Sequence, residues 1–279
     1  MSLILSQVNR VAFELFGLPV YWYALIIVSS IILAMYLSSR EAQRVGMKAD
    51  DVYDFMLIGL PLAFVGARIY YIIFDIQPYL ADPIQIFNIR AGGLAIYGGL
   101  IAGGAWLIYF CYKNYIDIWK FLDIAAPNVL LAQAIGRWGN FMNHEAFGGK
   151  TTLEFLQQLH LPKFIIENMY IDGFYRQPTF LYESLWSITG FVIIILLRKY
   201  RTSMFKQGEI ALSYCIWYSF GRFFIEGMRT DSLYLFGPIR VSQLLSAILF
   251  VGAFAVGYYR RKQNISDYTR SLGSNEFII

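Results

Sequence analysis

The chain has 279 residues, of which 57% are hydrophobic and only 15% are charged, and its mean hydropathy is +0.49. A net charge of +4, two cysteines and two histidines argue against nucleic-acid binding, a disulfide framework and a metal site. Cofactor and nucleotide motifs are also absent from the sequence. We therefore expect an integral membrane protein that uses neither a metal nor a cofactor.

Repeated apolar stretches come close to the ~20 residues that a helix needs to cross the hydrocarbon of a bilayer. They predict membrane helices over residues 20–37, 53–74, 93–112, 121–141, 179–197, 208–225 and 241–259. The expected fold class is an all-α integral membrane bundle of about seven transmembrane helices, forming a single membrane domain over residues 1–279. Residues 142–178 are polar and amphipathic, and they predict a small outward-facing cap between the fourth and fifth helices.

Four arginines lie inside these apolar runs or at their rims. They are Arg68, Arg137, Arg222 and Arg229. An uncompensated charge at that depth costs at least ~2.5–3.5 kcal/mol on insertion scales. Because arginine is a planar, permanently charged fork that binds phosphate in a bidentate manner, a phosphate-bearing lipid is the first ligand to consider.

The second and fifth segments each carry one of the unusual charges. Arg68 follows Gly66 and Ala67, and Glu183 stands just inside the membrane after Pro178. Glu183 either balances a buried arginine, for which Arg68 is a candidate, or transfers a proton.

The third segment is rich in glycine. Gly99 and Gly103 stand one helical turn apart, a spacing that lets helix backbones approach closely. The alternative is a functional one, because the doubled pairs Gly92-Gly93 and Gly98-Gly99 would expose bare backbone that admits a lipid headgroup.

A polar cluster follows the apolar run of the fourth segment. Arg137, Asn140 and His144 recur at helical spacing, which predicts that they share one face. Asn143 and Glu145 lie at the same depth. The alternative is a simple interfacial anchor, in which the arginine reaches the headgroups beside an aromatic residue.

The sixth segment carries a polar stripe on an aromatic helix. Tyr218, Arg222, Glu226 and Arg229 follow one another at offsets of four, four and three residues. The pair Arg222 and Glu226 is able to form a self-contained ion pair. That pair leaves Arg229 without a charge partner on the stripe.

The loops differ in basic residues, which sets the expected orientation. One set of loops holds 13: Arg40, Arg44, Lys48, Lys113, Lys120, Arg198, Lys199, Arg201, Lys206, Arg260, Arg261, Lys262 and Arg270. The other set holds six: Arg10, Arg90, Lys150, Lys163, Arg176 and Arg240. The first set is expected in the cytoplasm, which places the amino terminus and the cap outside and the carboxyl terminus inside.

Several motifs in the same order resemble those of the prolipoprotein diacylglyceryl transferase family. They are Tyr21-Trp22-Tyr23, Gly66-Ala67-Arg68, the glycine stretch 92–99, Gly136 to Glu145, Pro178 to Glu183, Gly221 to Asp231 and Arg240 to Gln243. The resemblance covers essentially the whole chain. It implies a seven-helix membrane bundle with an outward-facing head in the bacterial cytoplasmic membrane.

The resemblance also implies an activity and its partners. The diacylglyceryl group of phosphatidylglycerol would move to the lipobox cysteine of a preprolipoprotein, with release of glycerol phosphate, as the first step of lipoprotein maturation. Residues that match family positions are Tyr23, Arg137, Asn140, Tyr218, Arg222, Glu226 and Arg229. Family members commonly have histidine where this chain has Ala91 and Tyr97, which puts a histidine general base in doubt and allows a paralogue with altered activity.

We hypothesise that the arginine guanidinium groups account for the larger share of the lowering of the reaction barrier. A thiol with a reference pKa near ~8.5 is already a good nucleophile and needs no strong base. In this scheme Arg137 and Arg222 clamp the phosphate, Arg229 with Glu226 tunes entry or orientation of the substrate, and a third group assists deprotonation. Candidates for that third group are Tyr97, His144 and Glu145. Expected substrate-binding residues are Arg137, Asn140, Asn143, Tyr23, Gly98, Gly99, Tyr218, Glu226, Arg229 and Arg68.

Two other function classes are consistent with buried arginines. An anionic-lipid transporter or flippase also places them along its pathway, but polar residues here gather only at the outer ends of three segments and no inverted repeat is detectable. A structural membrane partner is the weaker alternative, because scaffolding gives no reason for several buried arginines.

Overall fold

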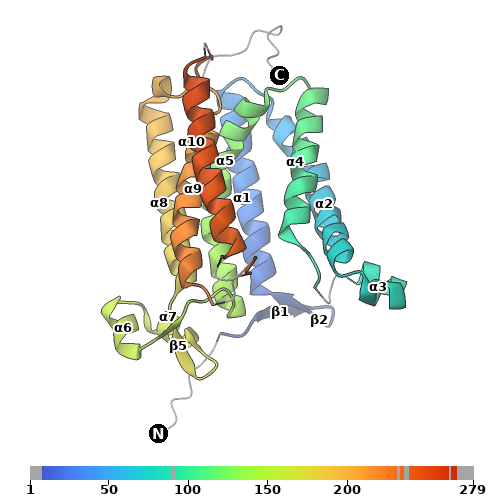
Figure 1. The fold of residues 1–279 in the computed structure, drawn as a ribbon, viewed down its shortest axis with the longest axis vertical. Helices are drawn as coiled ribbons and strands as arrows, with labels where there is room; N and C mark the ends of the chain where they lie inside the picture. Colours follow the sequence, from blue (N-terminus) through green and yellow to red (C-terminus); the bar gives the residue numbers. More distant parts are fainter. Residues whose placement is uncertain (1–7, 89–91, 231–232, 236–238, 264, 269–279) are drawn as a thin grey trace. The chain divides into compact units, whose positions relative to one another are not determined.

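The computed structural model describes residues 8–88, 92–230, 233–235, 239–263 and 265–268 (Figure 1). The helices are α1 (Trp22–Arg44), α2 (Ala49–Phe74), α3 (Gln77–Ala81), η1 (Pro83–Phe87), α4 (Ile96–Lys113), α5 (Ile118–Asn143), α6 (Leu153–Gln158), α7 (Lys163–Asn168), α8 (Thr179–Tyr200), η3 (Thr202–Met204), α9 (Glu209–Met228) and α10 (Val241–Arg261). The strands are β1 (Val11–Leu15), β2 (Leu18–Tyr21), β3 (Lys150–Thr151), β4 (Tyr170–Ile171) and β5 (Phe174–Arg176).

The chain is mostly helical, as expected for an all-α membrane protein. Each of the seven predicted segments coincides with one long helix, namely α1, α2, α4, α5, α8, α9 and α10. In the described part of the chain, α1, α2, α5, α8 and α10 are long and apolar enough to cross a membrane. The integral membrane class is therefore confirmed, and α4 and α9 are long helices that do not meet this joint criterion of length and composition.

The residues form two compact units, which are described separately. The larger unit comprises residues up to 37 together with 123–268, and the smaller unit comprises residues 38–122. Arg137, Glu183 and Arg222 belong to the larger unit, and Arg68 and Tyr97 to the smaller one.

Helices α8, α9 and α10 run side by side in the larger unit (Figure 1). The amino terminus of α9 is capped from α5 by Asp123, whose carboxylate accepts the backbone N–H groups of Gly208 at 2.6 Å and Ala211 at 2.8 Å. A helix begins with unpaired N–H groups, so this fully buried carboxylate both satisfies two of them and complements the helix dipole. The cap thereby fixes α9 relative to α5.

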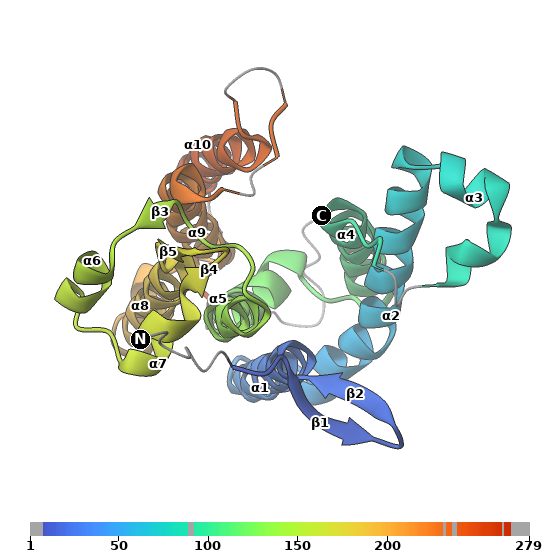
Figure 2. The ribbon, with the colours of Figure 1, turned by 90° about the horizontal axis from the view of Figure 1, so that it is seen from below.

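Residues 142–178 fold into short elements around a small core of their own. The strands form an antiparallel sheet in the order β3-β5-β4, and α6 and α7 complete the segment beside the ends of α8 and α9 (Figure 2). Leu156, Ile165 and Met169 pack against Phe141 at the end of α5 and Phe180 at the start of α8. This packing attaches the segment to the helices that carry the polar clusters.

Helices α2 and α4 pack together closely in the smaller unit. Trp106 of α4 donates its indole N–H to the carbonyl oxygen of Phe55 in α2 at 2.9 Å. A Cβ at Gly59 would come within 2.9 Å of the same indole ring, so the tryptophan occupies space that only glycine leaves open.

A β-hairpin of β1 and β2 precedes α1, and the hydropathy pattern did not predict it. Its two-residue turn has positive φ at both Phe16 and Gly17, the geometry of the favoured two-residue hairpin turns. The strands are too short to appear in a search for membrane-length apolar runs.

Candidate functional site

One carboxylate of α8 connects the polar clusters of α5 and α9. Glu183 Oε2 lies 2.6 Å from Arg137 Nε, and its Oε1 lies 2.9 Å from Arg222 Nη1. Arg222 Nη2 lies in turn 2.6 Å from Oε2 of Glu226, one turn further along α9. Three helices thus bring two arginines together on the two oxygens of one glutamate.

These charges are largely removed from solvent. The side chains of Glu183 and Glu226 are 7% and 3% exposed, and those of Arg137 and Arg222 are 20% and 14% exposed. Charges buried to this extent are stable only when they are paired and hydrogen-bonded. The sequence-based suggestion that Glu183 balances a buried arginine is confirmed, but the arginines are Arg137 and Arg222.

The protein uses only part of the donor capacity of Arg137 and Arg222. A guanidinium group has five N–H donors. Among the described residues, Arg137 uses one N–H donor for Glu183 and one for the side-chain oxygen of Asn140, which lies at 3.3 Å. Arg222 contacts Glu183 and Glu226 through its two Nη atoms. Both groups therefore keep N–H donors for a further acceptor.

Arg229 also approaches Glu183, with Nη1 4.0 Å from Oε1. Helix α9 ends at Met228, so Arg229 leaves the helical stripe on which the sequence placed it. This carboxylate belongs to α8 and not to the stripe on α9. Arg240, at the start of α10, donates to the backbone carbonyl oxygen of Glu226 and adds another cation to this end of α9.

The polar end of α5 is joined to the arginine pair through Asn140. Its amide accepts from Arg137 and donates to Glu145 Oε1 at 2.7 Å. Asn143 is the last residue of α5 and lies about one turn beyond Asn140. The shared face predicted for Arg137 and Asn140 is therefore confirmed.

His144 does not continue that face, which corrects the sequence-based expectation. The helix ends at Asn143, and His144 has a left-handed φ of 53°. Its Nε2 lies 3.3 Å from the side-chain oxygen of Asn168 in α7. The imidazole is thus held by the 142–178 segment rather than aligned with Arg137.

Tyr23 of α1 packs directly on α5. A Cβ at Gly139 would come within 2.9 Å of the Tyr23 ring, so the glycine admits the aromatic side chain. The phenol is near enough to Glu145 and Arg137 to interact with both charges. Tyr218 lies one turn before Arg222 on α9 and stacks on Tyr214, with ring centroids 5.8 Å apart.

Arg68 of the smaller unit has a structural role. Its five N–H donors all find backbone carbonyl oxygens, which belong to Gln85, Ile86, Asn88, Gly92 and Gly93 at distances of 2.6–3.3 Å. No donor is left for Glu183, so the pairing suggested from sequence is wrong. The same saturation argues against direct substrate binding by Arg68.

Gly98 and Gly99 of α4 lie against α2. A Cβ at Gly98 would collide with the backbone of Gly66, and one at Gly99 would lie 3.3 Å from the carbonyl oxygen of Ala63. The packing alternative therefore accounts for both glycines. Tyr97 lies beside Tyr70, with ring centroids 6.4 Å apart, and Ala91 is outside the described residues.

Sequence reasoning missed Glu183 as the centre of the network, together with Arg240 and Asn168. A glutamate inside an apolar segment was the available signal for the first. The other two lie in loops or short helices, where single polar residues are common. The described residues bring no three His, Cys, Asp or Glu side chains together as a metal site, and guanidinium groups supply the positive charge that this cluster offers.

Comparisons with known proteins agree over nearly the full length. The model of the prolipoprotein diacylglyceryl transferase family matches residues 10–259. The phosphatidylglycerol–prolipoprotein diacylglyceryl transferase of Enterococcus faecalis is 62% identical over 269 residues, which cover 96% of each chain. Enzymes of the same name from Pediococcus pentosaceus and Lactiplantibacillus plantarum are 54% and 50% identical, covering 96% and 100% of this chain and 97% and 99% of theirs. The chain belongs to the prolipoprotein diacylglyceryl transferase family.

Proposed function

We propose that this protein transfers the diacylglyceryl group of phosphatidylglycerol to the lipobox cysteine of a preprolipoprotein and releases glycerol phosphate. Its relatives at 50–62% identity are named for this transfer, and the chain shares their full length. This would be the first step of bacterial lipoprotein maturation.

The observation that carries the proposal is the sharing of Glu183 by Arg137 and Arg222. Glu183 Oε2 lies 2.6 Å from Arg137 and Oε1 lies 2.9 Å from Arg222, so each carboxylate oxygen holds one guanidinium. The two cations are therefore fixed before any ligand binds. Their remaining N–H donors suit the oxygens of a phosphodiester. A preorganised pair of this kind avoids the cost of gathering two like charges during the reaction.

The charge balance of the reaction explains why cations are needed. The sulfur of the cysteine forms a bond to a glyceryl carbon, and the bond from that carbon to the phosphate oxygen breaks. A thiolate and a phosphodiester monoanion become a neutral thioether and a phosphate monoester dianion. Because the phosphate gains one negative charge, Arg137 and Arg222 bind the leaving group more strongly than the substrate, which lowers the barrier.

The remaining residues follow from the same arrangement. Asn140 and Tyr23 lie at the edge of the site beside Arg137. Glu226 orients Arg222, and Arg229 adds a cation near Glu183. Three groups are candidates to take the thiol proton: Glu145, His144 and Tyr97. We favour Glu145, because Asn140 links it to Arg137, whereas Asn168 holds His144.

The chain is a multi-pass membrane protein of a bacterial family. Beyond this, we propose seven spans, in which α4 and α9 cross together with α1, α2, α5, α8 and α10. Residues 142–178 would then form an outward-facing cap on a single membrane domain. The basic loops place the amino terminus outside and the carboxyl terminus in the cytoplasm.

The test uses the purified full chain in vesicles that contain phosphatidylglycerol, with a lipobox peptide added. We expect a thioether-linked diacylglyceryl peptide and an equal amount of glycerol phosphate. A peptide with serine in place of the cysteine is the control and should remain unmodified. Movement of lipid between leaflets without thioether product would instead indicate a flippase, and neither result would indicate a paralogue with another substrate.

A further inference from the structure

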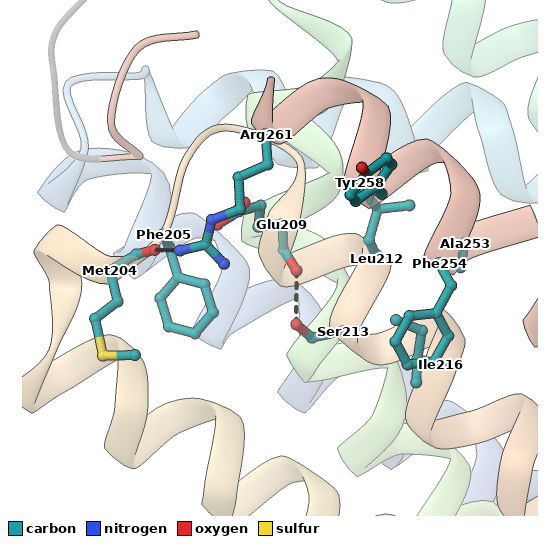
Figure 3. Close-up of a pocket in the computed structure, with 11 residues that line it drawn as sticks. Met204, Phe205, Glu209, Leu212, Ser213, Ile216, Ala253, Phe254, Tyr258 and Arg261 are labelled. Atoms are coloured by element: carbon teal, nitrogen blue, oxygen red, sulfur yellow. Dashed lines mark hydrogen bonds and ion pairs between the residues drawn. The ribbon is translucent and has the colours of Figure 1, made fainter. Parts of the chain in front are cut away.

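A cavity lies at the end of α9 that is remote from the arginine pair, between α9 and α10 (Figure 3). Its volume is about 360 Å³, which falls within the ~300–1,000 Å³ range of ligand pockets. Leu212 and Ile216 of α9 and Phe254 and Tyr258 of α10 form its apolar walls. Met204 of η3 and the loop that follows it close one side.

The rim of this cavity carries an excess of positive charge. Arg261 is 64% exposed, with Nε 3.6 Å from Glu209 Oε1 and Nη2 3.4 Å from the carbonyl oxygen of Met204. Lys262 Nζ lies 4.3 Å from the centroid of the Tyr258 ring. The basic residues at this end are Lys206, Arg260, Arg261 and Lys262, and the described acidic ones are Asp123, Glu209 and Asp267. Four cations are therefore set against three carboxylates, and Arg261 and Glu209 are the charged residues that line the cavity itself.

Only one class of ligand matches both parts of the cavity. Helix α10 is apolar enough to cross a membrane and ends at Arg261, so the cavity lies where the helix leaves the hydrocarbon layer. An acyl chain fits the apolar walls, and an anionic headgroup fits the cationic rim. We propose that this cavity binds an anionic phospholipid of the bilayer, with one acyl chain between α9 and α10 and its phosphate at Arg261.

This lipid is separate from the one that the arginine pair would clamp. Glu209 and Arg222 are thirteen residues apart on α9, which corresponds to about 20 Å along the helix axis. One headgroup cannot contact both positions. In the proposed orientation the second site faces the inner leaflet, whereas the arginine pair faces the outer one. The inference does not depend on the chemistry at that pair.

The first test labels the unmodified protein in vesicles. The probes are phosphatidylglycerol and phosphatidylcholine, each with a photoreactive diazirine in one acyl chain. We expect phosphatidylglycerol to label peptides containing residues 204–216 and 253–261 about five-fold more than phosphatidylcholine does, since one basic residue near the membrane surface is worth about that factor. Equal labelling by both lipids, or no labelling there, would overturn the proposal.

Variants then separate the two sites. A Cβ at Gly257 would lie 3.7 Å from Leu212 Cδ1, an ordinary contact, so Gly257→Leu directs its side chain into the cavity without a backbone clash. A Cβ at Gly252 of α10 meets nothing within 4 Å, and Gly252→Leu is the matched control. Arg261→Gln removes the rim cation, with the exposed Lys199→Gln as its control.

We expect Gly257→Leu and Arg261→Gln each to lower this labelling about five-fold, whereas the two controls and Arg137→Gln leave it unchanged. Loss of the same labelling in Arg137→Gln would mean that only one lipid site exists and would refute the second. If no lipid is attached and an added bifunctional reagent joins two protein copies through these peptides, a second chain occupies the cavity and the proposal is overturned.

Discussion

Trp186 of α8 and Trp217 of α9 hold each other by reciprocal hydrogen bonds. The indole N–H of Trp186 donates to the carbonyl oxygen of Trp217 at 3.0 Å, and that of Trp217 donates to the carbonyl oxygen of Trp186 at 2.9 Å. The rings are stacked, with centroids 4.3 Å apart and an interplanar angle of 15°. Gly190 and Gly221 leave the space that the two indoles fill.

This tryptophan pair fixes the register of α8 against α9. Trp186 stands three residues after Glu183, and Gly221 immediately precedes Arg222. Any sliding of one helix past the other would break both hydrogen bonds and would also separate Glu183 from Arg222. The ion pair of the candidate site therefore depends on an apolar contact about one turn away.

Replacing Gly221 with alanine should disturb both the fold and the site. The added Cβ would collide with the Trp186 indole, and overpacking of this kind costs about 1–3 kcal/mol. We expect Gly221→Ala to lower the thermal unfolding temperature in detergent and to reduce transfer to a lipobox peptide. Gly252→Ala is the control, because its Cβ meets no neighbour, and it should be neutral or slightly stabilising. Equal behaviour of the two variants would show that the indole moves aside freely.

Removing either guanidinium of the site should abolish transfer. Because one donor to a developing charge is typically worth about 10²–10³ in rate, we expect Arg137→Gln and Arg222→Gln each to lose at least about 100-fold. Both variants should still insert in the membrane, which protease protection of the loops can verify. Full transfer by purified Arg137→Gln protein would refute the phosphate clamp.

Neutralising Glu183 should lower the stability of the fold as well as the rate of transfer. Glu183→Gln leaves Arg137 and Arg222 without the carboxylate that separates them, and breaking a buried ion pair from one side costs about 3–5 kcal/mol. We expect a lower unfolding temperature and weaker transfer. Glu145→Gln is the comparison variant. Because Glu145 is exposed, this variant should reduce transfer with little change in stability. Unchanged stability of Glu183→Gln would contradict the shared-carboxylate geometry.

The sequence predicted the long helices well, because run length and apolarity reflect the bilayer directly. It placed their ends less well. The first segment was expected to stop at residue 37, but α1 continues to Arg44, since Ser38, Ser39 and Glu41 are buried in the fold. Hydropathy marks where an apolar layer ends, and a helix is free to continue beyond it.

The site was predicted in part. Arg137, Asn140, Arg222 and Glu226 were identified from local spacing, and the structure joins them. Their connection through Glu183 was not predictable, because it joins three helices that are distant in the sequence. The partner of Arg68 was misread for a related reason: a buried arginine looks alike in sequence whether a carboxylate or backbone carbonyl groups surround it.

The resemblance described above aligns Tyr97 with a histidine of the family, and the importance of Tyr97 is testable. The expected barrier lowering comes mainly from the arginines, and a thiol needs only modest help to ionise. Tyr97→Phe should therefore reduce transfer by much less than Arg137→Gln does, measured in the same vesicles. A Tyr97→Phe protein as inactive as the arginine variants would assign proton transfer to the tyrosine.

Arg68 should behave as a positioning residue for the chain around residues 85–93. Lysine keeps the charge but offers three donors on a flexible stem instead of five in a planar fork, so at least two carbonyl groups lose their partner in Arg68→Lys. These carbonyl groups belong to exposed or half-buried residues, and each lost hydrogen bond costs about 0.5–1.5 kcal/mol. We expect faster hydrogen exchange at residues 85–88 and 92–95 and a lower unfolding temperature, with membrane insertion retained. If Arg68→Lys preserved both exchange and stability while transfer fell, the planar guanidinium group of Arg68 would be needed for transfer itself rather than for holding this segment, and its assignment to substrate binding would be restored.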